Sequence, residues 1–260
     1  MQSEHETQAE RKARIGAAFG AAAARYEASA GVQRRVAAHL AAMAARERLP
    51  AGARILEIGC GTGLLTREIR QRWPRANLVA TDLAPEMLAM ARRDGAADQL
   101  LAMDGEHPVF DGAWFDLILS SLTFQWFTDL PAALARLHAL LRPGASLYFA
   151  TMGAESFASW RAAHAACGET AGIASYPTLA QLRALLAPYP DAFACDEHHQ
   201  LPERGGAALI RHFRGLGAQV PHAHYRPLGA SAMRRVIRAF DAGGGKTSYH
   251  VLYGRITHAG

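Results

Sequence analysis

The sequence predicts an α/β fold with a mostly parallel seven-stranded sheet, an N-terminal helical arm and a helical cap. Residues 53–152 alternate short apolar strand patterns with helical patterns, which is typical of a parallel sheet covered on both faces. The pattern before this region is helical from Ile15 to Arg48, and the pattern after it mixes helices with two alternating strands. We therefore divide the chain into an arm (1–48), a core (49–152) and a C-terminal part that completes the sheet and carries the cap (153–260).

The arm is expected to hold two helices divided at Gly31, after a polar start at residues 1–14 that we expect to fray. Phe19 and Tyr26 share one helical face. Tyr26 has two interpretations that the sequence leaves open. It is either a buried aromatic whose hydroxyl is satisfied, or part of a lid that closes over bound molecules.

The remaining elements follow from periodicity and from stop signals. Pro85 suits a first helical turn, the stretch 142–144 ends a helix, and Asp241–Gly245 is expected to be a flexible link. The expected strands span 54–58, 77–81, 99–103, 114–120, 145–151, 193–201 and 247–256, and the expected helices span 64–72, 85–94, 130–140, 155–167, 178–187, 207–216 and 231–240.

A glycine-rich turn joins the first strand to the helix after it, and the rest of the core is organised around it. Glycine lets backbone N–H groups approach a ligand closely. The spacing does not match the dinucleotide fingerprint G-x-G-x-x-G, because the third glycine would fall at Leu64. An acid before the first glycine would repel a pyrophosphate but suits a ligand with an ammonium group. The pattern E-x-G-x-G-x-G, formed by Glu57, Gly59, Cys60, Gly61 and Gly63, resembles the cofactor loop of class I S-adenosylmethionine-dependent methyltransferases.

Further candidate residues lie where later strands end, which is where ligands bind in such sheets. Asp82 ends the second strand, about 20 residues beyond the loop, and could accept both hydroxyls of a ribose. Asp104 ends the third strand and could accept from an adenine amino group, or could simply form a turn. Ser120 and Ser121 end the fourth strand, and their small side chains would leave room for a sulfonium group. We place Leu83, Met87 and Gly105, which follow these acids, in the same cofactor site.

The segment after the fourth strand carries aromatics and a glutamine. Gln125 and Trp126 either border the reaction centre or belong to the core, and the sequence leaves both interpretations open. Histidines at 198–199 and 222–224 could suggest a metal, but they lack i,i+4 spacing and a cysteine partner, so we expect no metal site.

Composition narrows the class of protein. The formal charge of +5 favours an acidic partner but is too weak to indicate nucleic acid, and no apolar run is long enough to span a membrane. Residues 1–14 are too polar for a signal peptide. Cys60, Cys167 and Cys195 lie far apart without a C-x-x-C pair, which favours reduced thiols in a cytoplasmic protein. We interpret Cys60 as a small residue packed under the loop.

Four segments resemble the malonyl-[acyl-carrier protein] O-methyltransferases of biotin biosynthesis. They are 18–27 with 32–34 in the arm, 120–126 after the fourth strand, 213–218 in the C-terminal half, and 247–254 in the closing strand. Together with the cofactor loop they span almost the whole chain in order. The loop alone specifies only the superfamily, whereas the arm, the 213–218 segment and the closing strand are more specific.

The resemblance implies a Rossmann-like class I methyltransferase fold with a helical cap. It implies methyl transfer from S-adenosyl-L-methionine to the free carboxyl of a malonyl thioester on an acidic acyl carrier protein, an early step of biotin (pimeloyl) synthesis. The carboxylate is ionised at neutral pH, so no catalytic acid or base is expected. Tyr26, Gln125 and Trp126 would wall the reaction centre, and Arg214 is the candidate for the malonyl carboxylate because a guanidinium can pair bidentately. The arginines at 204, 211, 234, 235 and 238 could dock the carrier.

This chain departs from the family pattern at two places. The family commonly has a lysine at the position of Arg214, and an Asn-Arg-Phe-like stretch where this chain has residues 174–176, Ala-Ser-Tyr. One expected positive charge is therefore missing, and Arg211, Arg214 or Arg226 could replace it. Two alternatives stay open. One is a carboxyl methyltransferase of a small, aconitate-like free acid, which would favour clustered positive groups in its pocket. The other is a non-catalytic module that binds a carrier or the cofactor.

Overall fold

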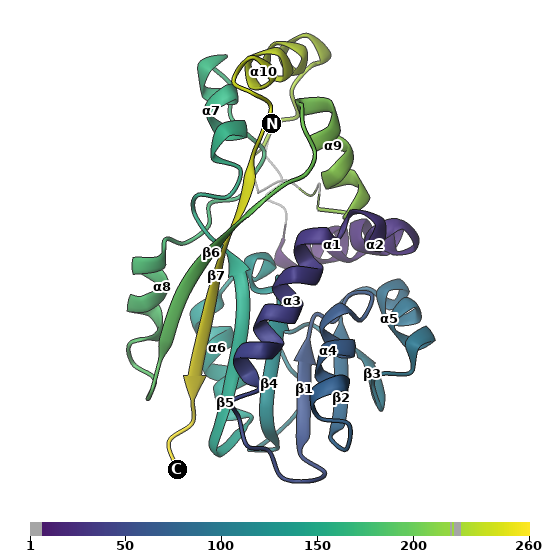
Figure 1. Cartoon of the computed structure of the whole chain (residues 1–260), viewed down its shortest axis with the longest axis vertical. Helices are drawn as coiled ribbons and strands as arrows, with labels where there is room; N and C mark the ends of the chain where they lie inside the picture. The colour runs from purple at the N-terminus through teal and green to yellow at the C-terminus, as the bar shows by residue number, and fades with distance from the viewer. Residues whose placement is uncertain (1–6, 219, 221–224) are drawn as a thin grey trace.

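A single seven-stranded sheet forms the centre of the protein (Figure 1). The computed structural model describes residues 7–218, 220 and 225–260. Within these ranges the strand order is β3-β2-β1-β4-β5-β7-β6. The first five strands in this order are parallel to one another, and β7 runs antiparallel to both β5 and β6. The predicted α/β fold with a mostly parallel sheet is confirmed. The strands are β1 (Arg54–Ile58), β2 (Asn77–Asp82), β3 (Gln99–Ala102), β4 (Phe115–Ser121), β5 (Leu141–Met152), β6 (Phe193–Gln200) and β7 (Ser248–Thr257).

Helices cover both faces of the sheet and build the arm and the cap. In Figure 1, α3 and α4 lie on the near face, while α6 lies behind the sheet. None of the described helices is long and apolar enough to cross a bilayer. The helices are α1 (Gln8–Ala22), η1 (Ala23–Arg25), α2 (Tyr26–Ser29), α3 (Gly31–Ala44), α4 (Leu64–Arg72), α5 (Pro85–Ala91), η2 (Arg92–Asp94), η3 (Phe124–Trp126), α6 (Leu130–Ala139), α7 (Ala158–Ala166), α8 (Leu179–Leu186), α9 (Gly206–Gly215) and α10 (Ala230–Ala242).

The expected fraying of residues 1–14 is wrong for the residues from Thr7 onward. Helix α1 begins at Gln8, the eighth residue of that polar stretch. Thr7 and Glu10 form a capping box: the Glu10 backbone N–H donates to Thr7 Oγ1 at 3.2 Å, and the Thr7 N–H donates to Glu10 Oε2 at 2.7 Å. The T-x-x-E pattern in the sequence indicates this helix start. The prediction missed it because it considered only the polar composition of the stretch.

The expected flexible link at Asp241–Gly245 is also wrong. Helix α10 continues to Ala242, and Asp241 Oδ1 accepts from the Gly206 N–H at 2.7 Å. The Gly245 N–H donates to the Phe240 carbonyl at 3.0 Å, and the Gly205 N–H donates to the Gly245 carbonyl at 2.9 Å. These bonds tie the end of α10 to the start of α9, so the glycines make a fixed turn.

The arm lies between the sheet and the cap. Figure 1 shows α1 and α2 crossing above the upper ends of the parallel strands, with α7, α9 and α10 standing beyond them. One apolar cluster joins α3 and α4 to the cap through buried residues such as Leu40, Leu65 and Trp160, while a second cluster fills the face under α6 and α8. The predicted division at residues 48 and 152 remains our proposal.

We expect Gly217→Ala to destabilise the protein through the contact between arm and cap. Gly217 follows α9 with φ +69°, and an added Cβ would lie 2.6 Å from the Ala18 carbonyl oxygen of α1. The free energy of unfolding should fall by about 1–3 kcal/mol, measured by urea denaturation. Gly229→Ala is the control, because no atom lies within 4 Å of its added Cβ. Equal urea midpoints for the two variants would contradict the expectation.

Candidate functional site

The glycine loop brings the end of β1 close to the segment that follows β4. Gly59 has φ +70°, and an added Cβ would lie 2.1 Å from Thr123 Oγ1, so glycine is required there on both grounds. The Cys60 N–H donates to the Thr81 carbonyl at 2.8 Å, and Cys60 is buried, as we expected. Gly63, with φ +92°, precedes the first residue of α4. The loop therefore opens directly into a helix N-terminus.

Glu57 lies buried at the end of β1 with only part of its carboxyl group satisfied. The Thr66 hydroxyl donates to Oε2 at 2.6 Å, while Oε1 has no hydrogen-bond partner. Burial raises the pKa of Glu57 to about 8, and the nearby Asp82 carboxylate adds to this shift against the opposing hydrogen bond from Thr66. An unpaired acceptor in such a place fits a ligand that carries an ammonium group.

The carboxylate of Asp82 links the end of β2 to the glycine loop by hydrogen bonds. Its Oδ2 accepts from the Gly61 N–H and its Oδ1 from the Ala84 N–H, each at 2.8 Å. Burial raises the pKa of Asp82, although these backbone donors oppose the rise. The carboxylate therefore fixes the loop and still borders the cavity beside it.

A cavity of about 80 Å³ lies beside the loop. Six predicted cofactor residues line it: Glu57, Gly59, Cys60, Gly61, Asp82 and Met87. Gly63, Leu83, Asp104, Gly105 and Ser120 are outside its lining. The hydroxyl of Ser120 is buried and donates to the Ile58 carbonyl at 2.9 Å, and it is Ser121 that lines the cavity.

Asp104, predicted to meet an adenine, is paired with the arm. The Lys12 ammonium of α1 makes ion pairs with both Asp104 and Glu106, and His107 Nδ1 lies 3.0 Å from Asp104 Oδ2. Burial opposes ionisation of Asp104, but the hydrogen bonds from Lys12 and His107 outweigh it and lower the pKa. Sequence reasoning did not single out Lys12, which ties the arm to the segment that follows β3.

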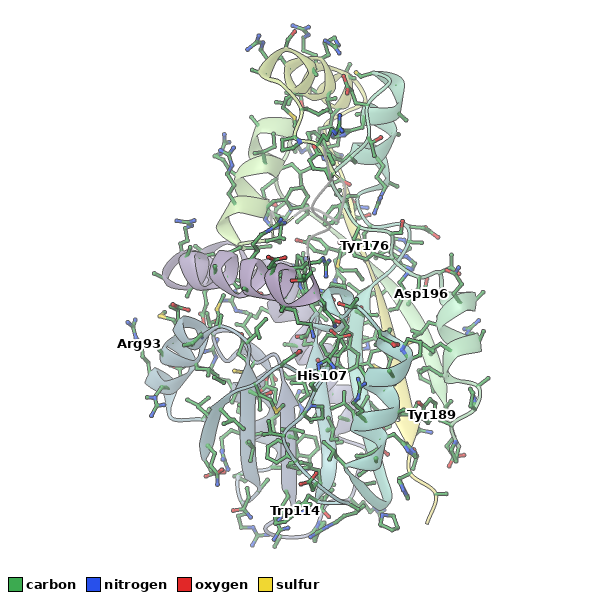
Figure 2. The ribbon with its side chains drawn as sticks, turned by 180° about the vertical axis from the view of Figure 1, so that it is seen from behind. Arg93, His107, Trp114, Tyr176, Tyr189 and Asp196 are labelled. Atoms are coloured by element: carbon green, nitrogen blue, oxygen red, sulfur yellow. The ribbon has the colours of Figure 1, made fainter. Side chains whose placement is uncertain are left out.

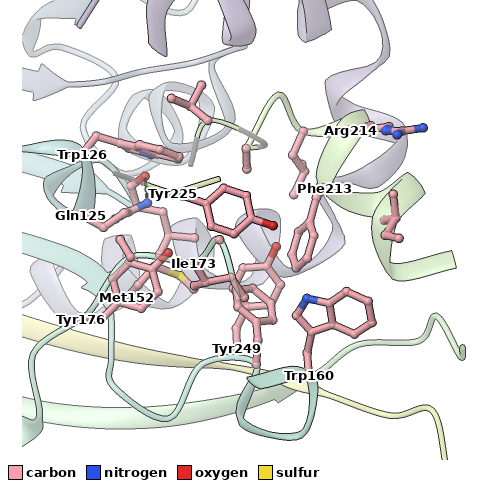
Figure 3. A pocket seen from close by; sticks show the side chains of 18 of the residues that line it. Gln125, Trp126, Met152, Trp160, Ile173, Tyr176, Phe213, Arg214, Tyr225 and Tyr249 are labelled. Atoms are coloured by element: carbon pink, nitrogen blue, oxygen red, sulfur yellow. Dashed lines mark hydrogen bonds between the residues drawn. The ribbon is translucent and has the colours of Figure 1, made fainter. Parts of the chain in front are cut away.

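A second, larger cavity of about 410 Å³ lies between the arm, the core and the cap (Figure 3). Its wall is mainly aromatic and apolar. All four predicted positioning residues, Tyr26, Gln125, Trp126 and Arg214, belong to its lining. The other lining residues labelled in Figure 3 are Met152, Trp160, Ile173, Tyr176, Phe213, Tyr225 and Tyr249.

The segment after β4 turns sharply so that its side chains reach this cavity. Leu122 has φ +53°, an uncommon conformation for a residue with a side chain, and its N–H donates to the Ala150 carbonyl at 2.8 Å. Gln125 Nε2 donates to the Leu122 carbonyl at 2.5 Å. Trp126 packs edge-on against Phe19 of the arm, with ring centroids 5.3 Å apart.

Arg214 borders the cavity without pointing into it. Its side chain is exposed, and Figure 3 shows the guanidinium directed away from Tyr225 and Tyr249. The other guanidinium in the lining, among the described residues, belongs to Arg11 of α1. Arg11 is half-buried and donates to the Trp126 carbonyl at 3.5 Å. Sequence reasoning missed Arg11, because it lies in the stretch that we expected to fray.

The altered stretch at residues 174–176 is held by an arginine from α7. Arg161 donates to the carbonyls of Ile173 and Ala174, at 3.4 and 2.7 Å, and lies over the Tyr176 ring at 5.9 Å. Burial raises the pKa of Tyr176 to about 12, so its hydroxyl keeps its proton. A neutral, aromatic wall thus stands where the family pattern led us to expect a positive charge.

Gln33 is a further residue that sequence reasoning missed. It is buried on α3, and it lines both the loop cavity and the large cavity. Five residues are common to the two linings: Phe19, Tyr26, Gln33, Leu122 and Trp126. A signal was available, because Gln33 shares a helical face with Val36, Ala37 and Leu40 and is the polar member of that buried stripe.

The histidines of β6 and β7 lie outside both cavities. His198 and His250, with Glu155, place possible ligand atoms within 4.8 Å of one another. The two rings are stacked, 4.5 Å apart and 6° from parallel, so their in-plane lone pairs do not converge on one ion. They contact carboxylates instead: His250 Nε2 lies 3.0 Å from Asp196, and His198 Nε2 lies 3.2 Å from Glu155. The histidines at 222 and 224 lie outside the described residues.

Comparisons with known proteins agree with this geometry. A family described as a methyltransferase domain matches residues 56–149. Two solved structures are similar in fold: the YcgJ protein from Bacillus subtilis, with 16% identity, TM-score 0.57 and coverage of 85% of this chain and 99% of that one, and the plantazolicin methyltransferase BpumL in complex with SAH, with 15% identity, TM-score 0.54 and coverage of 96% and 97%.

Several curated proteins are similar in sequence. The bifunctional biotin biosynthesis protein BioCD of Bordetella avium is 44% identical over 93% of this chain, which spans about half (51%) of that protein's length. Malonyl-[acyl-carrier protein] O-methyltransferases of Magnetococcus marinus and Serratia marcescens are 38% and 34% identical, over 96% and 94% of this chain and 94% and 95% of their own lengths. This chain therefore belongs to the malonyl-[acyl-carrier protein] O-methyltransferase family of S-adenosylmethionine-dependent methyltransferases.

Proposed function

We propose that this protein methylates the free carboxyl group of a malonyl thioester carried by an acyl carrier protein, an early step of biotin synthesis. One observation carries the proposal: a small cavity with a glycine loop and carboxylates shares a wall with a large aromatic cavity. Such a shared wall lets a methyl donor and an acceptor meet without water between them. The methyl acceptor in this proposal is the one that the names of the Magnetococcus and Serratia relatives state.

The residues around the loop fit S-adenosylmethionine. The unpaired Oε1 of Glu57 suits its ammonium group, and Asp82, at the end of the adjacent strand, suits its ribose. When bound, S-adenosylmethionine supplies a sulfonium methyl: a carboxylate oxygen forms the new C–O bond as the C–S bond breaks, and the electron pair stays on sulfur. Asp104 would have to exchange Lys12 for an adenine amino group to act as we predicted.

The protein's own task in this reaction is positioning. The malonyl carboxylate is already ionised at neutral pH, so no side chain needs to remove a proton. Tyr26 and Trp126 line both cavities and would flank the reacting atoms, while Gln125 would border the acceptor. For the malonyl carboxylate we favour Arg11 over Arg214, because Arg11 is half-buried in the lining beside Trp126, whereas the exposed guanidinium of Arg214 points away from Tyr225 and Tyr249.

The two alternatives receive less support. A free polyacid calls for several positive groups directed into the cavity. The described part of its lining holds two guanidinium groups: that of Arg214 is turned away, and that of Arg11 donates to the Trp126 carbonyl. The non-catalytic alternative rested on the altered stretch at 174–176. That stretch is anchored by Arg161 and forms an ordered part of the cavity wall, so its sequence departure does not imply a collapsed site.

A basic surface on the cap would receive an acidic carrier. Arg234 and Arg238 are exposed and one helical turn apart on α10, and Arg211 is exposed on α9. Arg235, also on α10, pairs with Glu169 at 3.0 Å. We place the reaction in the cytoplasm, because Cys60, Cys167 and Cys195 are free thiols.

A methyl-transfer assay tests this function. Purified protein and labelled S-adenosylmethionine are offered malonyl-carrier protein, malonyl-coenzyme A, malonate and aconitate. We expect label chiefly on the carrier-bound malonyl group, and the double variant Arg234→Glu/Arg238→Glu should raise the KM for that substrate about tenfold at low salt while sparing malonyl-coenzyme A. The control is Arg93→Glu, far from α10 (Figure 2), which should change neither KM. Label confined to a free acid would overturn the proposal.

Glu57→Gln should weaken cofactor binding and stabilise the ligand-free protein at high pH. The folded-state pKa, about 8, lies above the ordinary value of 4.5, so the stability from the bound proton is present below pH 4.5 and lost as pH rises through 8. The wild-type Tm should therefore fall between pH 6 and 9 more than that of the variant. Affinity for S-adenosylhomocysteine should drop about 10–100-fold, since a charge-assisted hydrogen bond is lost. Parallel Tm profiles, together with unchanged calorimetric affinity, would contradict this role.

Arg11→Gln and Arg214→Gln separate the two candidate partners of the malonyl carboxylate. With malonyl-coenzyme A as acceptor, which removes carrier docking, we expect Arg11→Gln to raise KM about tenfold or more through the loss of a charged hydrogen bond. Arg214→Gln should change KM less than threefold, because its guanidinium is exposed and points outward. The reverse order would restore Arg214 as the carboxylate partner.

A further inference from the structure

One buried hydrogen-bond donor lies at the cap end of the large cavity without a partner. Trp160, on α7, is 4% exposed and lines the large cavity but not the loop cavity. Figure 3 shows it across the cavity from Trp126 and Gln125, with its indole nitrogen directed into the space between them. No group in the described part of the chain accepts a hydrogen bond from this N–H. A buried donor without an acceptor is costly unless a ligand supplies one.

The packing of the cap fixes the direction of this N–H. Gly206, at the start of α9, makes room for the indole, because an added Cβ would lie 3.1 Å from Trp160 Cζ3. Cζ3 belongs to the ring edge opposite Nε1. The ring of Phe240 on α10 lies 5.1 Å from the indole at 87°, and the ring of His164 lies 4.8 Å away at 74°. A rotation of the indole would push against α9 and α10, so the N–H stays directed into the cavity.

The position of Trp160 decides which part of the methyl acceptor is able to reach it. The reacting carboxylate has to lie at the wall that the two cavities share, to which Tyr26 and Trp126 belong. A malonyl group has about six non-hydrogen atoms, whereas sites of about 300–1,000 Å³ typically hold drug-sized ligands. The cavity of about 410 Å³ therefore has room for part of the thiol arm that carries the malonyl group.

The chemistry of this arm matches the cap end of the cavity. The thiol arm of an acyl carrier protein, which coenzyme A shares, is a flexible chain in which methylene groups alternate with amides. An indole N–H only donates, and an amide carbonyl is a strong acceptor. Apolar members of the lining, such as Ile173 and Phe213, suit the methylene groups. Phe240, which packs on Trp160, belongs to α10, the helix whose arginines we place against the carrier.

We propose that the indole N–H of Trp160 donates to the carbonyl of the amide nearest the thioester in the carrier's thiol arm. This inference rests on the proposed function for its acceptor, and it adds a residue that recognises the arm instead of the malonyl group. The contact holds the arm at the cap end, so that the carboxylate end of the acceptor is directed to the shared wall. A free diacid lacks this amide, so Trp160 favours a thioester over free malonate.

Two malonyl thioesters of equal length test this contact. The thioester of N-acetylcysteamine carries the amide, and the thioester of pentanethiol has methylene groups in its place. We expect Trp160→Phe to raise the KM for the amide thioester about five- to tenfold with kcat unchanged, because one hydrogen bond remote from the reacting atoms is lost. The KM for the pentyl thioester should change less than twofold. Replacement of Trp160 by benzothienylalanine, which exchanges the N–H for sulfur, should give the same pattern, and it carries the test if Trp160→Phe does not fold.

Trp114→Phe is the matched control. Trp114 is 49% exposed and lies at the opposite end of the molecule from the cap (Figure 2), so this variant should change neither KM. Equal increases in KM for the two thioesters would place the contact on the thioester or the malonyl group and overturn the proposal. A wild-type protein that methylates the amide thioester no better than the pentyl thioester would overturn it as well. Malonyl-carrier protein, assayed in parallel, separates these results from a failure of the proposed function, which its lack of methylation by the wild-type protein would reject.

Discussion

A buried carboxyl group at the end of β1 is the constraint on which the site depends. Glu57 cannot be solvated there, so Thr66 of α4 satisfies one oxygen and the other is left for a ligand. The glycine loop must pass directly over this group, and Gly59 does so against Thr123, where any Cβ would clash. Asp82 then ties the loop to β2. The strand ends, the loop and the helix start are thus fixed together before any ligand binds.

The arm and the cap add what the core fold lacks, which is a second, largely apolar cavity next to the loop. Lys12 pins α1 to Asp104 and Glu106, and Gly217 of the cap packs against the backbone of α1. Aromatic side chains from all three parts then enclose the space next to the loop. A methyl transfer between a sulfonium and a carboxylate needs placement more than acid–base chemistry, and this arrangement supplies placement.

The lining of the large cavity explains why the departures from the family pattern are compatible with an intact site. The position expected to carry an arginine lies in a stretch that Arg161 holds by hydrogen bonds to the carbonyls of Ile173 and Ala174. In this stretch Tyr176, under the Arg161 guanidinium, gives the cavity an aromatic surface. A positive charge reaches the cavity instead from the arm, through Arg11. The tertiary structure thus assigns the charge to a different segment from the one that the sequence pattern singled out.

The sequence alone determined the fold, the cofactor loop, and Glu57 and Asp82 beside it, because these depend on local rules: strand and helix periods, glycine spacing, and acids at strand ends. Tertiary structure decided the rest. The Ser120 hydroxyl donates to the Ile58 carbonyl, and Asp104 pairs with Lys12. The side chain of Arg214 points outward, whereas Gln33 and Arg11 line the large cavity. Their directions depend on how arm, core and cap pack against one another, and residues so distant in sequence carry no local signal of that packing.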